Sequence, residues 1–153
     1  MNEESCQFDP KVVLDKPLML HLATTCGEGP RSSPLWFLYE DNKIWLFGIH
    51  NDSFIRRLQD EPRCALSTVD FDLEKGVLLH VGIRGVATLQ SLDQNRLERF
   101  VSKYLGPNTK SWNDWFVQNI VTPLDVMVAI ETQSIVAKDV SFFKTGPNLA
   151  SKM

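Results

Sequence analysis

The residues that could bind a charged ligand begin with a stretch at positions 49–57 of the 153-residue chain. A predicted strand runs there directly into a predicted helix, which begins at the hydroxyl of Ser53 and continues through Arg56 and Arg57. The free N–H groups and the dipole of a helix N-terminus attract anions, and a guanidinium group forms paired hydrogen bonds with phosphate. The stretch therefore predicts a phosphate site, and a capped surface helix with solvated arginines is the alternative.

A second stretch, residues 31–34, has the composition of a strand at the edge of a sheet. Pro34 cannot donate a hydrogen bond to a neighbouring strand, so it favours an edge strand or a bulge. Ser32 and Ser33 are small enough to let a planar heterocycle approach the unpaired N–H and C=O groups of such an edge. The alternative is an ordinary edge strand whose following aromatic residues lie in the core.

A third stretch contains two polar side chains that strand alternation places on one face. His80, Gly82 and Arg84 share that face, and the residues between them point the other way. A flat centre between His80 and Arg84 could hold a polar ligand, and these two are the candidates for catalysis or substrate contact. A solvent-facing polar row is the alternative. His21, His50 and His80 share no metal-ligand spacing, so no metal site is expected.

Aromatic residues gather on a short helix predicted near residue 115. Trp112, Trp115 and Phe116 have the spacing of a face that packs against the sheet or against a partner subunit. In a functional interpretation, one indole borders the plane of a cofactor ring, because aromatic edges and faces pack well on such planes.

Composition and charge exclude several classes of partner. Sixteen Lys and Arg against nineteen Asp and Glu give a net charge of −3, without the basic field that favours nucleic acid. No apolar run reaches the roughly 20 residues that span a bilayer, and the acidic N-terminus lacks the pattern of a signal peptide. The three cysteines form no CxxC pair and have no base beside them, so no zinc knuckle, disulfide framework or thiol catalysis is expected. We therefore expect a cytoplasmic protein without nucleic-acid or membrane partners.

The elements that must position these residues are mostly strands. Residues 1–16 form a lead-in with a helical turn at 11–15, and residues 17–153 form a single domain. Short loops can join only antiparallel neighbours, and glycines at 82 and 85 indicate a bulge in a long strand. The expected strands are 18–24, 31–39, 44–48, 63–71, 77–92, 126–132 and 134–140, and the expected helices are 54–60, 94–105 and 111–120. This order predicts a small antiparallel barrel with helices at one side.

Several of these motifs occur in the order found in a known family. They are the runs 22–24, 30–37 and 44–47, then Ser53 with 56–58, then 62–66 and 82–87. The chain resembles the pyridoxamine 5'-phosphate oxidase-like family of FMN-binding split β-barrels over residues 17–92. The resemblance implies a mainly β fold with flanking helices, and a homodimer with two FMN sites at the subunit interface.

The resemblance also implies which residues contact the cofactor. They are Arg31, Ser32, Ser33 and Pro34 at the isoalloxazine edge, Gly48 and Ile49 beside the ring or the ribityl chain, Ser53 with Arg56 or Arg57 at the phosphate, and Trp112 or Trp115 over the ring. His80 and Arg84 would be nearby barrel residues that reach across the dimer.

The chain departs from the family pattern at two places. The family's phosphate motif reads Ser-Arg-Lys, whereas Ser53 is followed here by Phe54 and Ile55. Residues 144–153 also lack the Trp- and Arg-containing segment of true pyridoxamine phosphate oxidases, so oxidation of vitamin B6 is not expected. The expected function is an FMN-dependent oxidoreductase of a small molecule. The alternatives are a deazaflavin-dependent reductase and a non-catalytic flavin or haem carrier or sensor.

Overall fold

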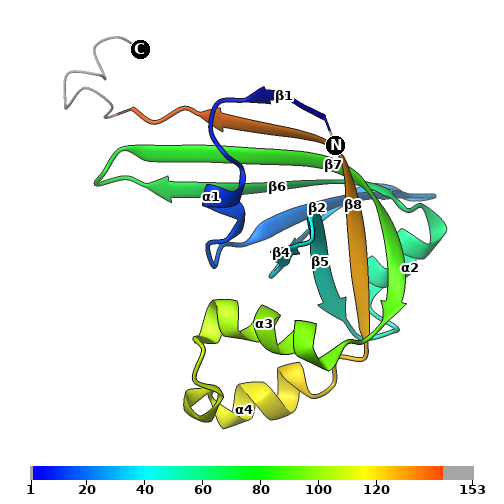
Figure 1. The fold of residues 1–153 in the computed structure, drawn as a ribbon. Coiled ribbons are helices and arrows are strands. Elements are labelled where there is room, and N and C mark those ends of the chain that lie inside the picture. Colours follow the sequence, from blue (N-terminus) through cyan, green and yellow to red (C-terminus); the bar gives the residue numbers. More distant parts are fainter. Residues whose placement is uncertain (1, 143–153) are drawn as a thin grey trace.

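The computed structural model describes residues 2–142, whose strands join in one eight-stranded sheet (Figure 1). The strands are β1 (Asn2–Cys6), β2 (Leu20–Cys26), β3 (Gly29–Leu35), β4 (Leu38–Glu40), β5 (Lys43–Gly48), β6 (Arg63–Asp72), β7 (Val77–Ser91) and β8 (Val126–Asp139). The helical segments are α1 (Lys11–Leu14), α2 (Ser53–Asp60), α3 (Gln94–Leu105), the 3₁₀ turn η1 (Thr109–Ser111), α4 (Asp114–Phe116) and the π-helical η2 (Val117–Val121).

The sheet curls into a split barrel because two consecutive strands stand at its opposite edges. The strand order is β3-β2-β6-β7-β8-β5-β4, yet only Trp36 and Phe37 separate β3 from β4 along the chain. The single strand predicted at 31–39 is therefore wrong, since its halves pair with different neighbours, Leu35 with Leu20 and Leu38 with Trp45. The predicted fold class, a mainly β antiparallel split barrel with flanking helices, is confirmed.

Two apolar clusters hold the fold together. The first fills the barrel, and α2 contributes Phe54, Ile55 and Leu58 to it, so this helix closes one end of the barrel. The second lies between β5, β8 and α3, where Phe47 and Phe100 pack with their ring centroids 4.4 Å apart. Figure 1 shows α3 and α4 together below β4 and β5. Because β5 has the barrel on one face and α3 on the other, nearly all of its residues are buried.

The bulge predicted in the long strand 77–92 is confirmed. The pairing of β7 with β8 shifts between Arg84 and Gly85, where the strand passes very close to β8. A side-chain carbon at Gly85 would lie 2.6 Å from Cγ2 of Ile130 and 2.7 Å from the carbonyl oxygen of Glu131. Only glycine fits this approach, which bends β7 and increases its twist.

The helix after β7 also follows its sequence signals. The carboxylate of Asp93 accepts hydrogen bonds from the amides of Asn95 and Arg96 at the start of α3, and Gly106 ends the helix with φ of 93°. The helix predicted at 111–120 is confirmed over most of its length, because the chain is helical from Asp114 to Val121 as α4 and η2, but it begins three residues later than predicted and its second half is π-helical. The side chains of Asn108 and Asn113 each accept a backbone N–H and so begin new short segments there.

The N-terminal lead-in contains one element that the sequence pattern missed. The helical turn predicted at 11–15 is confirmed as α1, but β1 precedes it and pairs in parallel with β8. No helix among the residues in the structure is both long and apolar enough to cross a membrane. Residues 144–153, at which the sequence departs from the oxidase pattern, lie outside the described residues.

Candidate functional site

One face of the sheet points away from the barrel core and carries the third sequence motif. Along β2, Leu20, Leu22 and Thr24 are buried while the residues between them are exposed, and the strand register extends this division across β6, β7 and β8. We call the outward side the open face. Its cross-strand rows are Ser32-Ala23-Ala65-Arg84-Ser134, Pro34-His21-Ser67-Gly82-Val136 and Val69-His80-Lys138.

The open face has a small, flat centre with cationic side chains around it. Alanine, serine and glycine occupy most of the middle positions, so a planar molecule could come close to the backbone. Two adjoining hollows of about 470 and 530 Å³ share Ala65 and Arg84, with His80 and Lys138 lining the first and Arg63 lining the second. The prediction that His80, Gly82 and Arg84 share a face is confirmed, since Val81 and Ile83 between them are 1% and 4% exposed.

The strand at residues 31–34 stands at the edge of the sheet, as predicted. Within the described sheet β3 pairs only with β2, so its other side presents unpaired backbone groups. Ser32 and Pro34 lie on the open face, whereas Arg31 and Ser33 lie on the opposite side, in register with Thr24 and Leu22. The four residues predicted at the isoalloxazine edge therefore divide between the two sides of β3.

Arg57 joins this edge strand to α2 through two neutral hydroxyl groups. Its Nε donates to Oγ1 of Thr24 at 2.8 Å, and one terminal nitrogen donates to Oγ of Ser33 at 2.9 Å. The residue is only 9% exposed, and no carboxylate among residues 6–142, whose side chains the structure describes, forms an ion pair with it. A buried cation without a counter-charge is unfavourable, so an anion beside it would lower the free energy. Arg31, placed opposite Thr24 by the register, adds a second positive charge on this side.

Two backbone amides in the turn that precedes α2 already donate hydrogen bonds to carboxylates of the protein. Asp52 accepts a hydrogen bond from the amide of Ile49 at 2.8 Å, and Asp125 accepts one from the amide of His50 at the same distance. Ser53 and Arg56 are exposed beyond this turn. The amides at 49 and 50 are therefore satisfied within the protein, and an anion here would meet the side chains of Ser53 and Arg56.

The departure from the Ser-Arg-Lys motif has a packing explanation. Phe54 is 7% exposed and belongs to the barrel core, and a side-chain carbon at Gly48 would lie 2.9 Å from its ring. The position that carries a cation in the family motif is here a core position. Around β3 and α2, Arg31, Arg56 and Arg57 are the residues that could supply positive charge to a phosphate instead.

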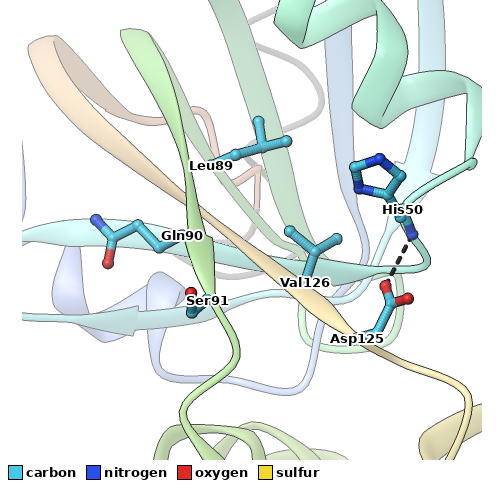
Figure 2. A pocket seen from close by; sticks show the side chains of 6 residues that line it. All are labelled: His50, Leu89, Gln90, Ser91, Asp125 and Val126. Atoms are coloured by element: carbon cyan, nitrogen blue, oxygen red, sulfur yellow. Dashed lines mark hydrogen bonds between the residues drawn. The ribbon is translucent and has the colours of Figure 1, made fainter.

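A separate open hollow with several polar groups lies beside this turn. It has a volume of about 340 Å³, and Figure 2 shows Asp125 and His50 on one side of it and Gln90 and Ser91 of β7 on the other. Leu89 and Val126 complete the lining. Its amide, hydroxyl and carboxylate groups suit a ligand rich in hydroxyl groups, and Gly48 and Ile49 immediately precede His50 in the chain.

The tryptophans predicted to cover a cofactor ring lie in the helical layer. Trp112 donates its Nε1 proton to the carbonyl of Gly106 at 2.8 Å, and Trp115 is 65% exposed. The structure instead places Trp36 directly after β3, stacked on Tyr104 with the ring centroids 4.2 Å apart. Neither predicted tryptophan is grouped with the edge strand or with the open face in any of the described contacts.

Several residues that complete the site escaped the sequence interpretation. Thr24 could have been found, because alternation along the strand places it beside Arg31 on the neighbouring strand. Asp125 and Lys138 come from distant positions of the chain and carried no local signal. Cys64 packs against the barrel core, and burial raises the pKa of its thiol to about 11, which agrees with the inert role predicted for it.

Comparisons with known proteins identify the fold. No family model matches the chain, and no curated protein matches it either. Among solved structures, a conserved hypothetical protein from Mycobacterium tuberculosis is 20% identical with a TM-score of 0.68, covering 91% of this chain and 89% of its own. An F420 reductase is 19% identical with a TM-score of 0.62, covering 88% and 98%. A FAD-binding protein from Mesorhizobium loti is 18% identical with a TM-score of 0.59, covering 86% and 92%. The chain shares the fold of these proteins across most of its length.

Proposed function

We propose that the protein binds FMN and is a flavin-dependent oxidoreductase that acts on a small molecule. The observation that carries this proposal is the buried guanidinium of Arg57, which is bonded to the edge strand β3 and lacks a carboxylate partner among the described residues. A phosphate near Arg57, Arg31 and Arg56 would supply the missing negative charge.

The rest of the cofactor would extend from this phosphate along β3. The unpaired backbone groups of the edge strand can bond the polar rim of an isoalloxazine ring, with Ser32 and Pro34 beside it. The open hollow of Figure 2, which is lined by the turn after Gly48 and Ile49 and by β7 and β8 rather than by β3, offers further polar groups that could bind hydroxyl groups of the ligand. The arginines and the edge strand therefore fit the chemistry of the phosphate and of the ring of FMN.

A second copy of the chain would complete the site. The hollows on the open face are broad, so a planar ring resting there would keep one side exposed to water. In a homodimer, the open face of the partner would cover the ring and bring His80 and Arg84 to it. Val69 and Phe71, which are 44% and 56% exposed on the same face, would be buried in that contact.

A bound flavin supplies the hydride transfer, and the chain's own residues would bind, orient and shield the reactants. Arg84 carries a permanent positive charge that stabilises negative charge developing on a reacting ligand. The imidazole of His80, in the next row of the open face, would hold or donate a proton to the substrate. Closing the face with a second copy would exclude water and strengthen both interactions.

The fold neighbours support this family of cofactors and leave a related one open. One of them is named an F420 reductase and another a FAD-binding protein. Deazaflavin F420 is therefore the second candidate, and it would use the same cationic groups for its anionic tail.

Flavin binding can be tested by titrating the purified protein with FMN, riboflavin and F420, following flavin fluorescence. We expect FMN to bind at least about tenfold more tightly than riboflavin, because a tenfold ratio requires only about 1.4 kcal/mol from the phosphate contacts. Arg57→Gln and the exposed Arg56→Gln should reduce this ratio, whereas Lys110→Gln, on a distant exposed turn, should preserve it. The FMN-loaded protein should bleach with a reduced nicotinamide and turn over with an electron acceptor.

Other outcomes would contradict the proposal. Equal affinity for FMN and riboflavin would show that no residue of the protein binds the phosphate. Binding of F420 without binding of FMN would show that the cofactor is the deazaflavin. A haem Soret band that disappears in His80→Ala, without flavin binding, would indicate a haem carrier on the same barrel.

A further inference from the structure

A cavity of about 170 Å³ lies away from the open face, between β5, the end of β3 and the helical layer. Its lining consists of apolar and aromatic side chains: Leu35, Trp36, Phe47, Phe100, Val101, Phe116, Ile120, Val121 and Leu124. None of these residues takes part in the flavin site proposed above. Part of the lining comes from α3, α4 and η2, and α3 and α4 lie below β4 and β5 in Figure 1.

The lining determines the chemistry of what can enter. It offers no charged side chain, so a charged ligand would lose its hydration without compensation. Aromatic side chains make up much of the wall, and Trp36 lies 5.3 Å from Phe116 in a stacked arrangement. Such walls favour another aromatic ring through edge and face contacts. The volume is close to that of an apolar cavity of about 150 Å³ that stays dry and binds benzene.

The part of the cavity wall that comes from the helical layer includes a π-helical segment. Residues Val117–Val121 form the π-helical η2, and Ile120 within it is 43% exposed while also lining the cavity. Ile120 thus stands at the rim, where the cavity meets solvent. Isolated π-helical turns are often found at functional sites, and this one places an apolar side chain at the entrance.

We propose that this cavity binds a small uncharged aromatic molecule of about one ring. Size, the absence of charge in the lining and the aromatic wall all select the same class of ligand. Binding here does not depend on flavin, so it is measured on flavin-free protein, and its failure would leave the proposed function untouched.

The test is a titration of the flavin-free protein with toluene, observed through the methyl NMR signals of the lining residues Leu35, Val101, Ile120, Val121 and Leu124. We expect saturable shifts confined to these methyl groups and a higher melting temperature at saturating toluene. Benzylammonium, which has the same ring with a positive charge, should bind at least tenfold more weakly. Shifts that do not saturate, or equal binding of the two probes, would overturn the proposal.

Two variants and one control distinguish binding in the cavity from general surface binding. Ile120→Lys places a charge at the rim, and Val121→Phe fills the cavity, so each should weaken toluene binding at least tenfold. Gln118→Lys adds the same charge to the same helical segment away from the lining and should leave the affinity unchanged. Unaltered affinity in both cavity variants would overturn the proposal. An affinity that falls as protein concentration rises would do so as well, since it would show that a second copy of the chain fills the cavity.

Discussion

Glu40 is the acidic residue whose surroundings most clearly couple the stability of the fold to pH. It forms ion pairs with Arg99 at 2.7 Å and with Arg96 at 2.9 Å, which tie the short strand β4 to α3. Hydrogen bonding from Arg99, and then from Arg96, lowers the pKa of Glu40 from 4.5 to about 2 in spite of its burial. Arg96 also lies over the ring of Trp45, 3.7 Å from its centroid, and so fixes the geometry of the pair.

The stability contributed by Glu40 should therefore be present above pH 4.5 and be lost as the pH falls toward 2. Glu40→Gln should lower the free energy of unfolding at pH 7 by about 2 kcal/mol, because charged hydrogen bonds are replaced by neutral ones. The difference from the wild type should disappear near pH 2. Urea unfolding at a series of pH values measures this, and a constant difference across the range would contradict it.

The elements of the fold differ in how far the sequence could predict them. Strand alternation predicted the face shared by His80 and Arg84, and capping residues predicted α3, because both signals are local. The break between β3 and β4 was not predictable in this way, since Trp36 and Phe37 continue the apolar pattern and only pairing with distant strands separates the halves. Strand β1 escaped for the same reason, because its partner lies more than a hundred residues away.

The candidate site was predictable to a similar extent. The edge position of Pro34 follows from its missing N–H group. The buried position of Arg57 could have been predicted as well, although two adjacent arginines look equivalent at first. Helical spacing from Phe54 and Leu58 would have placed Arg57 on the inner face of the helix, which is where the structure has it.

The bulge in β7 makes a prediction at the scale of a strand. Gly85→Ala should lower the free energy of unfolding by about 1–3 kcal/mol, because the added carbon overlaps backbone and side-chain atoms of β8. Gly82→Ala is the matched control on the same strand. Its added carbon would lie 3.4 Å from the His80 ring, an ordinary contact, so its effect should stay within about 0.5 kcal/mol. Equal effects of the two substitutions in urea unfolding would show that the bulge does not require glycine.

At the scale of the whole molecule, we expect the protein to form a homodimer. Light scattering during gel filtration should give twice the chain mass of 17.4 kDa, because a second copy of the chain would bury the exposed apolar side chain of Phe71 on the open face. Phe71→Asp should shift the mass toward one chain, and Val12→Asp, at a residue 52% exposed on α1, should not. A wild-type protein of single-chain mass at every concentration would contradict the homodimer.

The edge strand β3 has a further consequence for how the protein behaves at high concentration. A row of unpaired backbone groups is a template on which other chains can add strands and aggregate. Pro30 and Pro34 remove two donors from β3, and the chain turns at Trp36 and Phe37 into β4 at the other edge of the barrel. An incoming strand would meet few backbone hydrogen-bond donors and a short edge strand, which disfavours growth of a fibril. The same edge can therefore stay open to a flat ligand while resisting runaway self-association.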